Sequence, residues 1–167
     1  MFSAYYQAGE NRYRQRIGLD LEDFSVGLRF RHRPGVTLSQ QGNADEALDT
    51  LNGAMLHFDA HYAAATEWQR PLMVSTLTLQ CLIGMASKTY GRRRTILAFD
   101  DITMNGPLFG GDTLYAESTV LEKHDAKRAD AGVVKFKLIG KKPDGTVVVE
   151  IDRTVLVKRK SHYLKER

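Results

Sequence analysis

The sequence has a single cysteine, four prolines and no long uninterrupted apolar run. One cysteine cannot form an internal disulfide or a cysteine-based zinc cluster, so nothing in the sequence indicates an oxidising compartment. The N-terminal residues lack the apolar run and small-residue cleavage site of a signal peptide, and we therefore expect a cytoplasmic protein. No internal repeat, low-complexity tract or linker divides the 167 residues, which suffice for one domain with its own core.

The charged residues do not form a long tract of one sign. The chain has 24 Lys and Arg against 20 Asp and Glu, a net charge of +4. The basic residues come in short runs, such as Arg92, Arg93 and Arg94. This balance fits a small phosphorylated ligand or a solvated surface equally well, and we expect no nucleic-acid partner.

The most apolar stretch, residues 71–87, contains no charged residue in a chain that is 26% charged. The pattern predicts a central helix that is buried all round. Pro71 is expected to open it, because the N–H that proline lacks has no partner at a helix start. Polar residues within the stretch, among them Ser75 and Gln80, make it unsuited to span a membrane, which takes about 20 predominantly apolar residues. We expect no membrane association.

The first third of the chain predicts an arm, a strand and two short helices. Residues 1–22 are polar and aromatic, and they form either an arm that docks on the domain or a second subunit, or a partly disordered terminus. Residues 26–32 alternate in polarity as a strand does, and Pro34-Gly35 is expected to turn the chain. Ser39 and Asp59 are suited to cap the two helices.

The helix that follows Ser39 is expected to pack through apolar residues at helical spacing and to end at Asn52-Gly53, with Gly53 relieving the left-handed C-terminal position. These apolar residues are Ala44, Ala47, Leu48 and Leu51.

The second half of the chain has the period of strands. Residues 95–99, 114–120, 134–138 and 147–157 read as strands, with a hairpin turn at residues 143–145. Arg153 interrupts the apolar face of the last strand, which indicates a bulge or a paired site. The order of elements predicts an α+β domain, residues 23–160, in which an antiparallel sheet of about five strands wraps a long central helix. Residues 161–167 are left as a tail.

Three segments resemble a known family: LNGAMLHFDAHYAAATEWQRP (51–71), GGDTLYAESTVLEK (110–123) and VVVEIDRTVLVKRK (147–160). They are similar to the MaoC-like hydratases and dehydratases of the hotdog fold, and most to the itaconyl-CoA and mesaconyl-CoA hydratase branch. The resemblance implies reversible addition of water across the double bond of a 2-enoyl thioester. It also implies a homodimer or higher homo-oligomer, and no cofactor beyond the CoA or acyl carrier of the substrate.

The family's D-x-N-P-x-H motif falls on residues 52–57. Its His matches His57, its Asp is replaced by Asn52, and its Asn-Pro pair by Ala54-Met55. In the family the Asp and the His hold and activate the water. A base that works near neutral pH is what this chemistry needs, and histidine supplies one.

The resemblance places the oxyanion hole at the start of the central helix. Ser75, after Val74, stands where the family usually has Gly, and the backbone N–H groups of Val74 and Ser75 are expected to receive the charge that develops on the thioester oxygen. Arg92, Arg93 and Arg94, which leave the helix together, either grip the phosphates of CoA or are solvated charges at a helix end.

For several other polar residues, a structural role competes with a chemical one. His61 shares a helix face with His57, but no third ligand is evident, so we expect no metal site. Asp59 reads as a helix cap and Asp49 as a solvated residue, and either is an alternative source of the missing carboxylate. Cys81 lies in the apolar helix, where a thiolate is disfavoured.

Two rival functions remain open from the sequence. One is a hotdog acyl-CoA thioesterase, although such enzymes usually place an Asp or Glu on the central helix and this helix has none. The other is a non-catalytic subunit that binds acyl thioesters, which the departures at Asn52, Ala54 and Met55 leave open.

Overall fold

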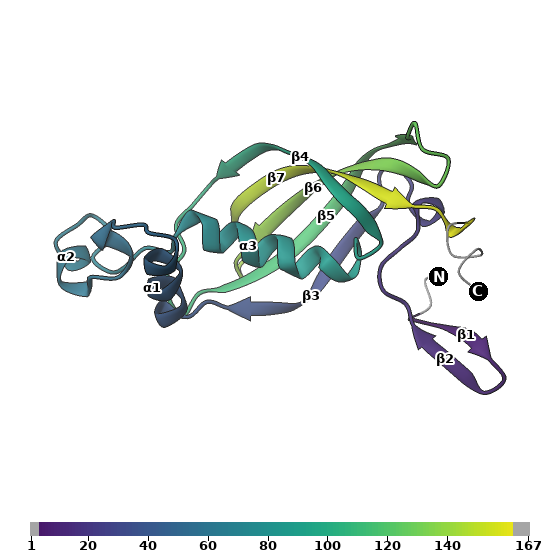
Figure 1. The fold of residues 1–167 in the computed structure, drawn as a ribbon. Helices are drawn as coiled ribbons and strands as arrows, with labels where there is room; N and C mark the ends of the chain where they lie inside the picture. Colours follow the sequence, from purple (N-terminus) through teal and green to yellow (C-terminus); the bar gives the residue numbers. More distant parts are fainter. Residues whose placement is uncertain (1–3, 162–167) are drawn as a thin grey trace.

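One antiparallel sheet dominates the computed structural model, which describes residues 4–161 apart from the side chain of Arg94 (Figure 1). Its five strands lie in the order β3-β5-β6-β7-β4. Their bounds are β3 (Arg29–Thr37), β4 (Arg93–Met104), β5 (Thr113–Asp125), β6 (Ala131–Lys141) and β7 (Val147–Lys158). Buried residues alternate with partly exposed ones along β5 and β6, so one face of the sheet packs on the core.

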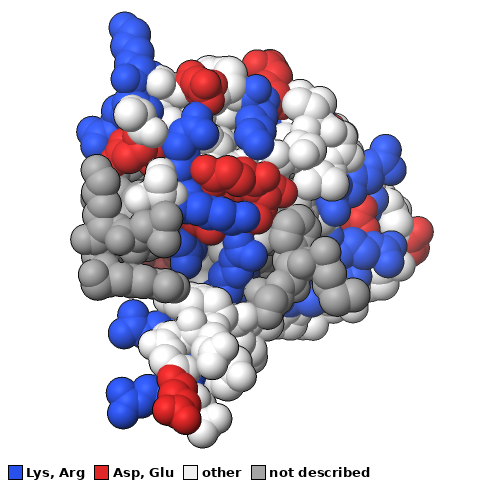
Figure 2. Space-filling view, turned by 90° about the vertical axis from the view of Figure 1, so that its right-hand side faces the viewer, with Lys and Arg blue, Asp and Glu red and all other residues white. Residues whose placement is uncertain are grey.

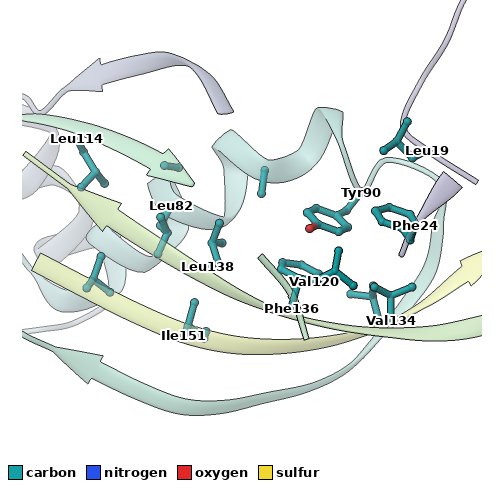
Figure 3. Packing of buried hydrophobic residues seen from close by; sticks show 14 of the residues in the cluster. Leu19, Phe24, Leu82, Tyr90, Leu114, Val120, Val134, Phe136, Leu138 and Ile151 are labelled. Carbon is teal, nitrogen blue, oxygen red and sulfur yellow. The ribbon is translucent and has the colours of Figure 1, made fainter. Parts of the chain in front are cut away.

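The central helix α3 (Ser75–Met85) crosses this face and continues into the 3-10 turn η3 (Ala86–Lys88) (Figure 1). Leu82 points from the helix toward Leu138 of β6, and Tyr90, just beyond the helix, stacks on Phe136 with 3.8 Å between ring centroids (Figure 3). The chain thus has the predicted α+β class and the hotdog arrangement of a sheet curled over one helix.

Helix α3 begins four residues later than predicted, at Ser75 rather than Pro71. Residues 71–74 are not helical, because Met73 N–H donates to the carbonyl of Leu108 at 2.9 Å and holds the chain extended. The helix is also not buried all round. Thr78 and Leu82 are buried, whereas Gln80 is exposed.

Three short elements lie at the end of the sheet where α3 starts (Figure 1). They are α1 (Gln40–Asp49), the 3-10 turn η2 (Met55–His57) and α2 (Ala60–Ala64). Both predicted caps are confirmed: Ser39 Oγ accepts from Gly42 N–H at 3.2 Å, and Asp59 Oδ1 accepts from Tyr62 N–H at 2.9 Å.

The predicted apolar face of α1 is confirmed at Ala47 and wrong at the two leucines. Its buried residues are Asn43 and Ala47, whereas Leu48 and Leu51 are 57% and 93% exposed. The helix ends at Asp49 with Thr50 as its C-cap, and Leu51, the next residue, takes the left-handed conformation (φ 59°) expected of Gly53. Asn52 N–H then donates to the carbonyl of Ala47 at 2.8 Å, the long-range bond of a Schellman motif.

Strand β3 runs through the turn predicted at Pro34-Gly35 and reaches Thr37. The strand lies at the sheet edge, where a proline does not interrupt the ladder, and its pairing with β5 is irregular between His32 and Val36. Strand β4, at the other edge, is likewise longer than the predicted strand 95–99.

The predicted arm, residues 1–22, has two parts in the described chain. The hairpin of β1 (Tyr5–Gly9) and β2 (Arg12–Gln15) projects from the domain (Figure 1), but Leu19 and Leu21, the latter in the turn η1 (Leu21–Asp23), belong to the core. Of the predicted tail, 161–167, only Ser161 is among the described residues. Across the described residues, no helix has the length and apolarity needed to cross a membrane.

Candidate active site

A pocket of about 410 Å³ opens at the start of α3 and brings together the four residues predicted to be catalytic. These are His57 from η2, Asn52 from the turn after α1, and Val74 and Ser75 from the start of α3. The pocket is lined by Glu46, Thr50, Asn52, His57, Val74, Ser75, Thr76 and Gln80.

The hydrogen bonding of His57 fixes which ring nitrogen carries the proton. Its Nδ1 atom lies 2.8 Å from the carbonyl oxygen of Leu72. Because a carbonyl can only accept, Nδ1 is the donor, and in the neutral ring Nε2 keeps its lone pair. The half-buried imidazole therefore has the form of a general base.

Asn43 of α1, which sequence reasoning missed, holds this arrangement together. Its buried side chain donates through Nδ2 to the carbonyls of His57 (2.8 Å) and Leu72 (3.0 Å), and its Oδ1 accepts from Val74 N–H at 2.7 Å. One side chain thereby links α1, η2 and the start of α3. In the sequence, the inward orientation of Asn43 is indicated by its spacing, because residues four apart share a helix face and Ala47 is buried.

The oxyanion hole predicted from Val74 and Ser75 needs one correction. The N–H of Val74 is bonded to Asn43, so Val74 shapes the pocket but has no donor to offer. The N–H groups of Ser75 and Thr76, in the first turn of α3, have no acceptor within residues 4–161. These two groups lie at the positive end of the helix dipole and are the candidate donors.

Asn52 presents its amide to the pocket in a defined orientation. Its Oδ1 accepts from Ala54 N–H at 3.1 Å, so the oxygen faces its own turn and the NH₂ group is left without an acceptor among the described residues. The family's Asp, which Asn52 replaces, holds the water through a carboxylate oxygen. In the structure, the NH₂ group is the more available part of the side chain.

The pocket contains a carboxylate that the sequence analysis did not identify. Glu46 comes from α1, and its Oε1 accepts from Gln80 Nε2 at 2.5 Å. The two acids proposed as substitutes do not line the pocket: Asp59 caps α2, and Asp49 is exposed at the end of α1. Only the folded structure shows that Glu46 lines this pocket, because in the sequence it lies outside the motif at residues 52–57.

A second pocket of about 370 Å³ lies on the other side of Ser75. Much of its lining is apolar, with Trp68, Met73, Met104 and Leu108 among the residues. Ser75 lines both pockets and is therefore shared by a mostly polar pocket and a mostly apolar one.

The structure does not bring the predicted phosphate-binding run to either pocket. Arg92 and Arg93 follow the opposite end of α3; Arg92 pairs with the buried Asp20 at 2.9 Å, and Arg93 donates to the carbonyl of Tyr90 at 3.1 Å. The side chain of Arg94 lies outside the described residues. Figure 2 views this end of the molecule and shows acidic and basic side chains next to one another rather than a patch of one sign.

The remaining candidates stay apart from the chemistry. His61 is exposed on α2, and the described residues contain no group of three metal-ligating side chains. Burial raises the pKa of the Cys81 thiol, and the negative charge of Glu46 raises it further. A thiol so affected is a weaker nucleophile.

The curled sheet over one helix, with a histidine and helix N–H groups meeting at the helix start, defines a MaoC-like protein of the hotdog fold. A family model described as mesaconyl-CoA hydratase matches residues 3–165. The chain therefore belongs to the mesaconyl-CoA hydratase family.

Two curated relatives share this family character. The β-methylmalyl-CoA dehydratase of Chloroflexus aurantiacus is 24% identical over 155 residues, which cover 83% of this chain and 44% of the relative. The mesaconyl-CoA hydratase of Haloarcula marismortui is 25% identical over 142 residues, which cover 83% of this chain and 40% of the relative. The chain thus spans less than half the length of these relatives.

Solved structures show the same fold. A putative MaoC domain dehydratase from Chloroflexus aurantiacus has a TM-score of 0.80 at 23% identity, over 85% of this chain and 45% of that one. A MaoC-like dehydratase from Rhodospirillum rubrum has a TM-score of 0.75 at 22% identity, over 86% and 99%. A Mycobacterium tuberculosis protein with a double hotdog fold has a TM-score of 0.76 at 25% identity, and 45% of that chain is covered.

Proposed function

We propose that the chain is a hydratase or dehydratase that reversibly adds water to a 2-enoyl thioester, with a CoA ester as the substrate. The observation that carries the proposal is the 2.8 Å bond between His57 Nδ1 and the Leu72 carbonyl. In the neutral ring this bond leaves the lone pair on Nε2, and His57 lines the pocket that also holds unpaired helix N–H groups. A base and oxyanion donors in one pocket are what addition to an enoyl thioester requires.

The reaction follows from these positions. His57 Nε2 takes a proton from water as the water oxygen bonds to the β-carbon. The electron pair of the double bond moves toward the thioester oxygen, where the N–H groups of Ser75 and Thr76 stabilise the enolate. The α-carbon then takes the proton back from the imidazolium, so the hydroxyl and the hydrogen add to the same face.

The apolar pocket suits the acyl part of the substrate. With the thioester oxygen at Ser75, a short acyl group fits among Trp68, Met73 and Leu108. The central helix carries no Asp or Glu, which argues against a thioesterase of the type that uses one there.

A second copy of the chain is proposed to pair along β4, the edge strand. Five apolar side chains on this strand are each at least 36% exposed, and an apolar edge strand is a template for pairing. They are Ile96, Leu97, Phe99, Ile102 and Met104. Antiparallel pairing about the middle of β4 would put Arg93 of one copy beside Met104 of the other, which lines the apolar pocket. Arg93 would then lie close to the substrate pocket of the opposite copy, where it could contact a phosphate of CoA.

The proposal is tested with crotonyl-, mesaconyl- and itaconyl-CoA. Loss of the conjugated double bond with formation of the 3-hydroxyacyl-CoA is the expected result. Release of free CoA thiol without hydration would favour the thioesterase, and binding without turnover of any of the three would favour the non-catalytic subunit. Either outcome would overturn the proposal.

A further inference from the structure

We infer that Glu46 is the carboxylate that acts with His57 in this site, an inference that rests on the proposed hydratase function. The family motif supplies an Asp five positions before the His, and this chain has Asn52 there, which cannot carry a negative charge. Glu46 comes from a different element, α1, and reaches the same pocket.

The helix that carries Glu46 is oriented by a buried clamp. Asn43, Glu46 and Thr50 are three and four residues apart, so they lie on one face of α1. Asn43 fixes that face against the carbonyl of His57 and the N–H of Val74. Glu46, one turn further on, is therefore held at the pocket by the same contacts that hold the base.

The carboxylate is positioned but not neutralised by a cation. Gln80 donates to its Oε1, while Oε2 has no hydrogen-bond partner and no ion pair within residues 4–161. No other lining residue of this pocket is acidic. Burial raises the pKa of the Cys81 thiol and the charge of Glu46 adds to this, consistent with the contact between Glu46 and Gln80 on α3.

Such a carboxylate has two uses in the hydration step. Its unpaired oxygen accepts a hydrogen bond from the attacking water and so orients the lone pair of that water toward the β-carbon. Its negative charge also stabilises the imidazolium that exists between proton removal from water and proton delivery to the α-carbon. Glu46 takes up no net proton, and the single proton shuttles through His57.

The test compares Glu46→Gln with Asp49→Asn, which removes an exposed carboxylate from the same helix. Glu46→Gln keeps the size of the side chain, and we expect kcat/KM to fall about 10²-fold, at the low end of the effect of positioned acid–base groups. Asp49→Asn should leave it unchanged. The acid limb of the pH profile should move to lower pH in Glu46→Gln, because removing a nearby negative charge disfavours the imidazolium.

A rescue experiment separates this role from a merely structural one. Introducing Asn52→Asp into Glu46→Gln returns a carboxylate to the family's position and should recover most of the lost rate, whereas Asn52→Ala in the same background should not. Gln80→Met, which removes only the partner of Oε1, should lower kcat less than Glu46→Gln does.

The outcomes distinguish this inference from the proposed function. If the unaltered protein hydrates an enoyl-CoA and Glu46→Gln is equally active with an unchanged pH profile, Glu46 has no part in the reaction and only the present inference fails. A loss in Glu46→Gln that Asn52→Asp does not restore would assign Glu46 to the structure of the pocket and would also overturn it. If the unaltered protein hydrates none of the substrates, the proposed function itself fails.

Discussion

The side-chain oxygen of Asn43 lies 2.7 Å from the amide nitrogen of Val74, and this buried bond joins α1 to the start of α3. The same side chain donates to the carbonyls of His57 and Leu72. The position of the base and the position of the helix start therefore depend on one amide group.

Asn43→Ala should lower both stability and activity. It leaves the N–H of Val74 without its partner, whereas the carbonyls of His57 and Leu72 each keep one other donor, Gln40 Nε2 and His57 Nδ1. A buried polar group left unpaired costs about 1–3 kcal/mol, so we expect a loss of about that size in the free energy of unfolding. Urea unfolding measures the loss, and kcat should fall with it because His57 is no longer held. Gln41→Ala, on the exposed side of the same helix, is the control and should change neither.

His57→Ala should reduce the hydration rate about 10²–10⁴-fold, since it removes the positioned base. His61→Ala is the matched control, four residues further on and exposed; it should retain full activity. Steady-state kinetics with the best enoyl-CoA substrate measures the activity of both variants. Full activity in His57→Ala would mean that the imidazole only supports the loop through its bond to Leu72.

The exposed edge strand β4 predicts a dimer in solution. Light scattering at micromolar concentration should give twice the mass of the chain, and Leu97→Glu should shift the protein toward the monomer because a charge would be buried between two edges. Leu51→Glu alters a more exposed leucine away from β4 and should leave the dimer intact. A monomer for the unaltered chain would contradict the pairing.

His32 predicts a loss of stability in mild acid. It is buried with its Nε2 2.9 Å from Ser118 Oγ, and burial, aided by the charge of Arg33, lowers the pKa of His32 from 6.5 to about 4. Between these two pH values, the unfolded chain therefore binds a proton at His32 that the folded chain does not bind. Stability is full above pH 6.5 and falls by up to about 3 kcal/mol as the pH drops toward 4.

Urea unfolding across this pH range measures the effect. His32→Gln should flatten the dependence, whereas replacing the exposed His124 by Gln should leave it as in the unaltered chain. An unchanged slope in His32→Gln would assign the acid sensitivity to other groups.

Arg153 predicts a variant that is more stable than the natural chain. Its side chain is fully buried, and its three guanidinium nitrogens have no hydrogen-bond partner within the described residues. The rings of Phe99 and Phe136 lie 5.4 and 5.9 Å from its Cζ. Arg153→Met should raise the free energy of unfolding by about 1–4 kcal/mol, because an apolar side chain avoids the burial of an unpaired charge.

The pH dependence of this stability difference tests whether the buried charge of Arg153 is its cause. Burial, and then the charge of Arg93, lowers the pKa of Arg153 from 12.5 to about 10, so the natural chain gains stability as the pH rises above 10 and the proton is released in the folded state. The advantage of Arg153→Met should shrink over that range. Arg29→Met, at an exposed position, should show neither effect.

Sequence patterns predicted what depends on local chemistry and on hydrophobic period. The alternation in β5, β6 and β7, the caps Ser39 and Asp59, and the apolar central helix were all readable because each is determined within a few residues. The histidine of the site followed from the motif around residue 57, which resembles that of the family.

The errors came from contacts between distant segments. The start of α3 moved from Pro71 to Ser75 because Met73 bonds to Leu108, which no local preference encodes. Glu46 and Asn43 were missed for the same reason, since only the folded chain turns that face of α1 toward His57.

The reactive side chains, from Asn43 to Ser75, are carried by a stretch that lies beyond the end of the sheet rather than within it (Figure 1). Of this stretch, Met73 joins the core cluster, whose other members, among them Leu82, Tyr90 and Phe136, come from outside it. The residues that carry the chemistry and most of those that form the core thus lie in separate parts of the chain, so substitutions at pocket positions other than Asn43 and Met73 can alter the site while the sheet stays folded.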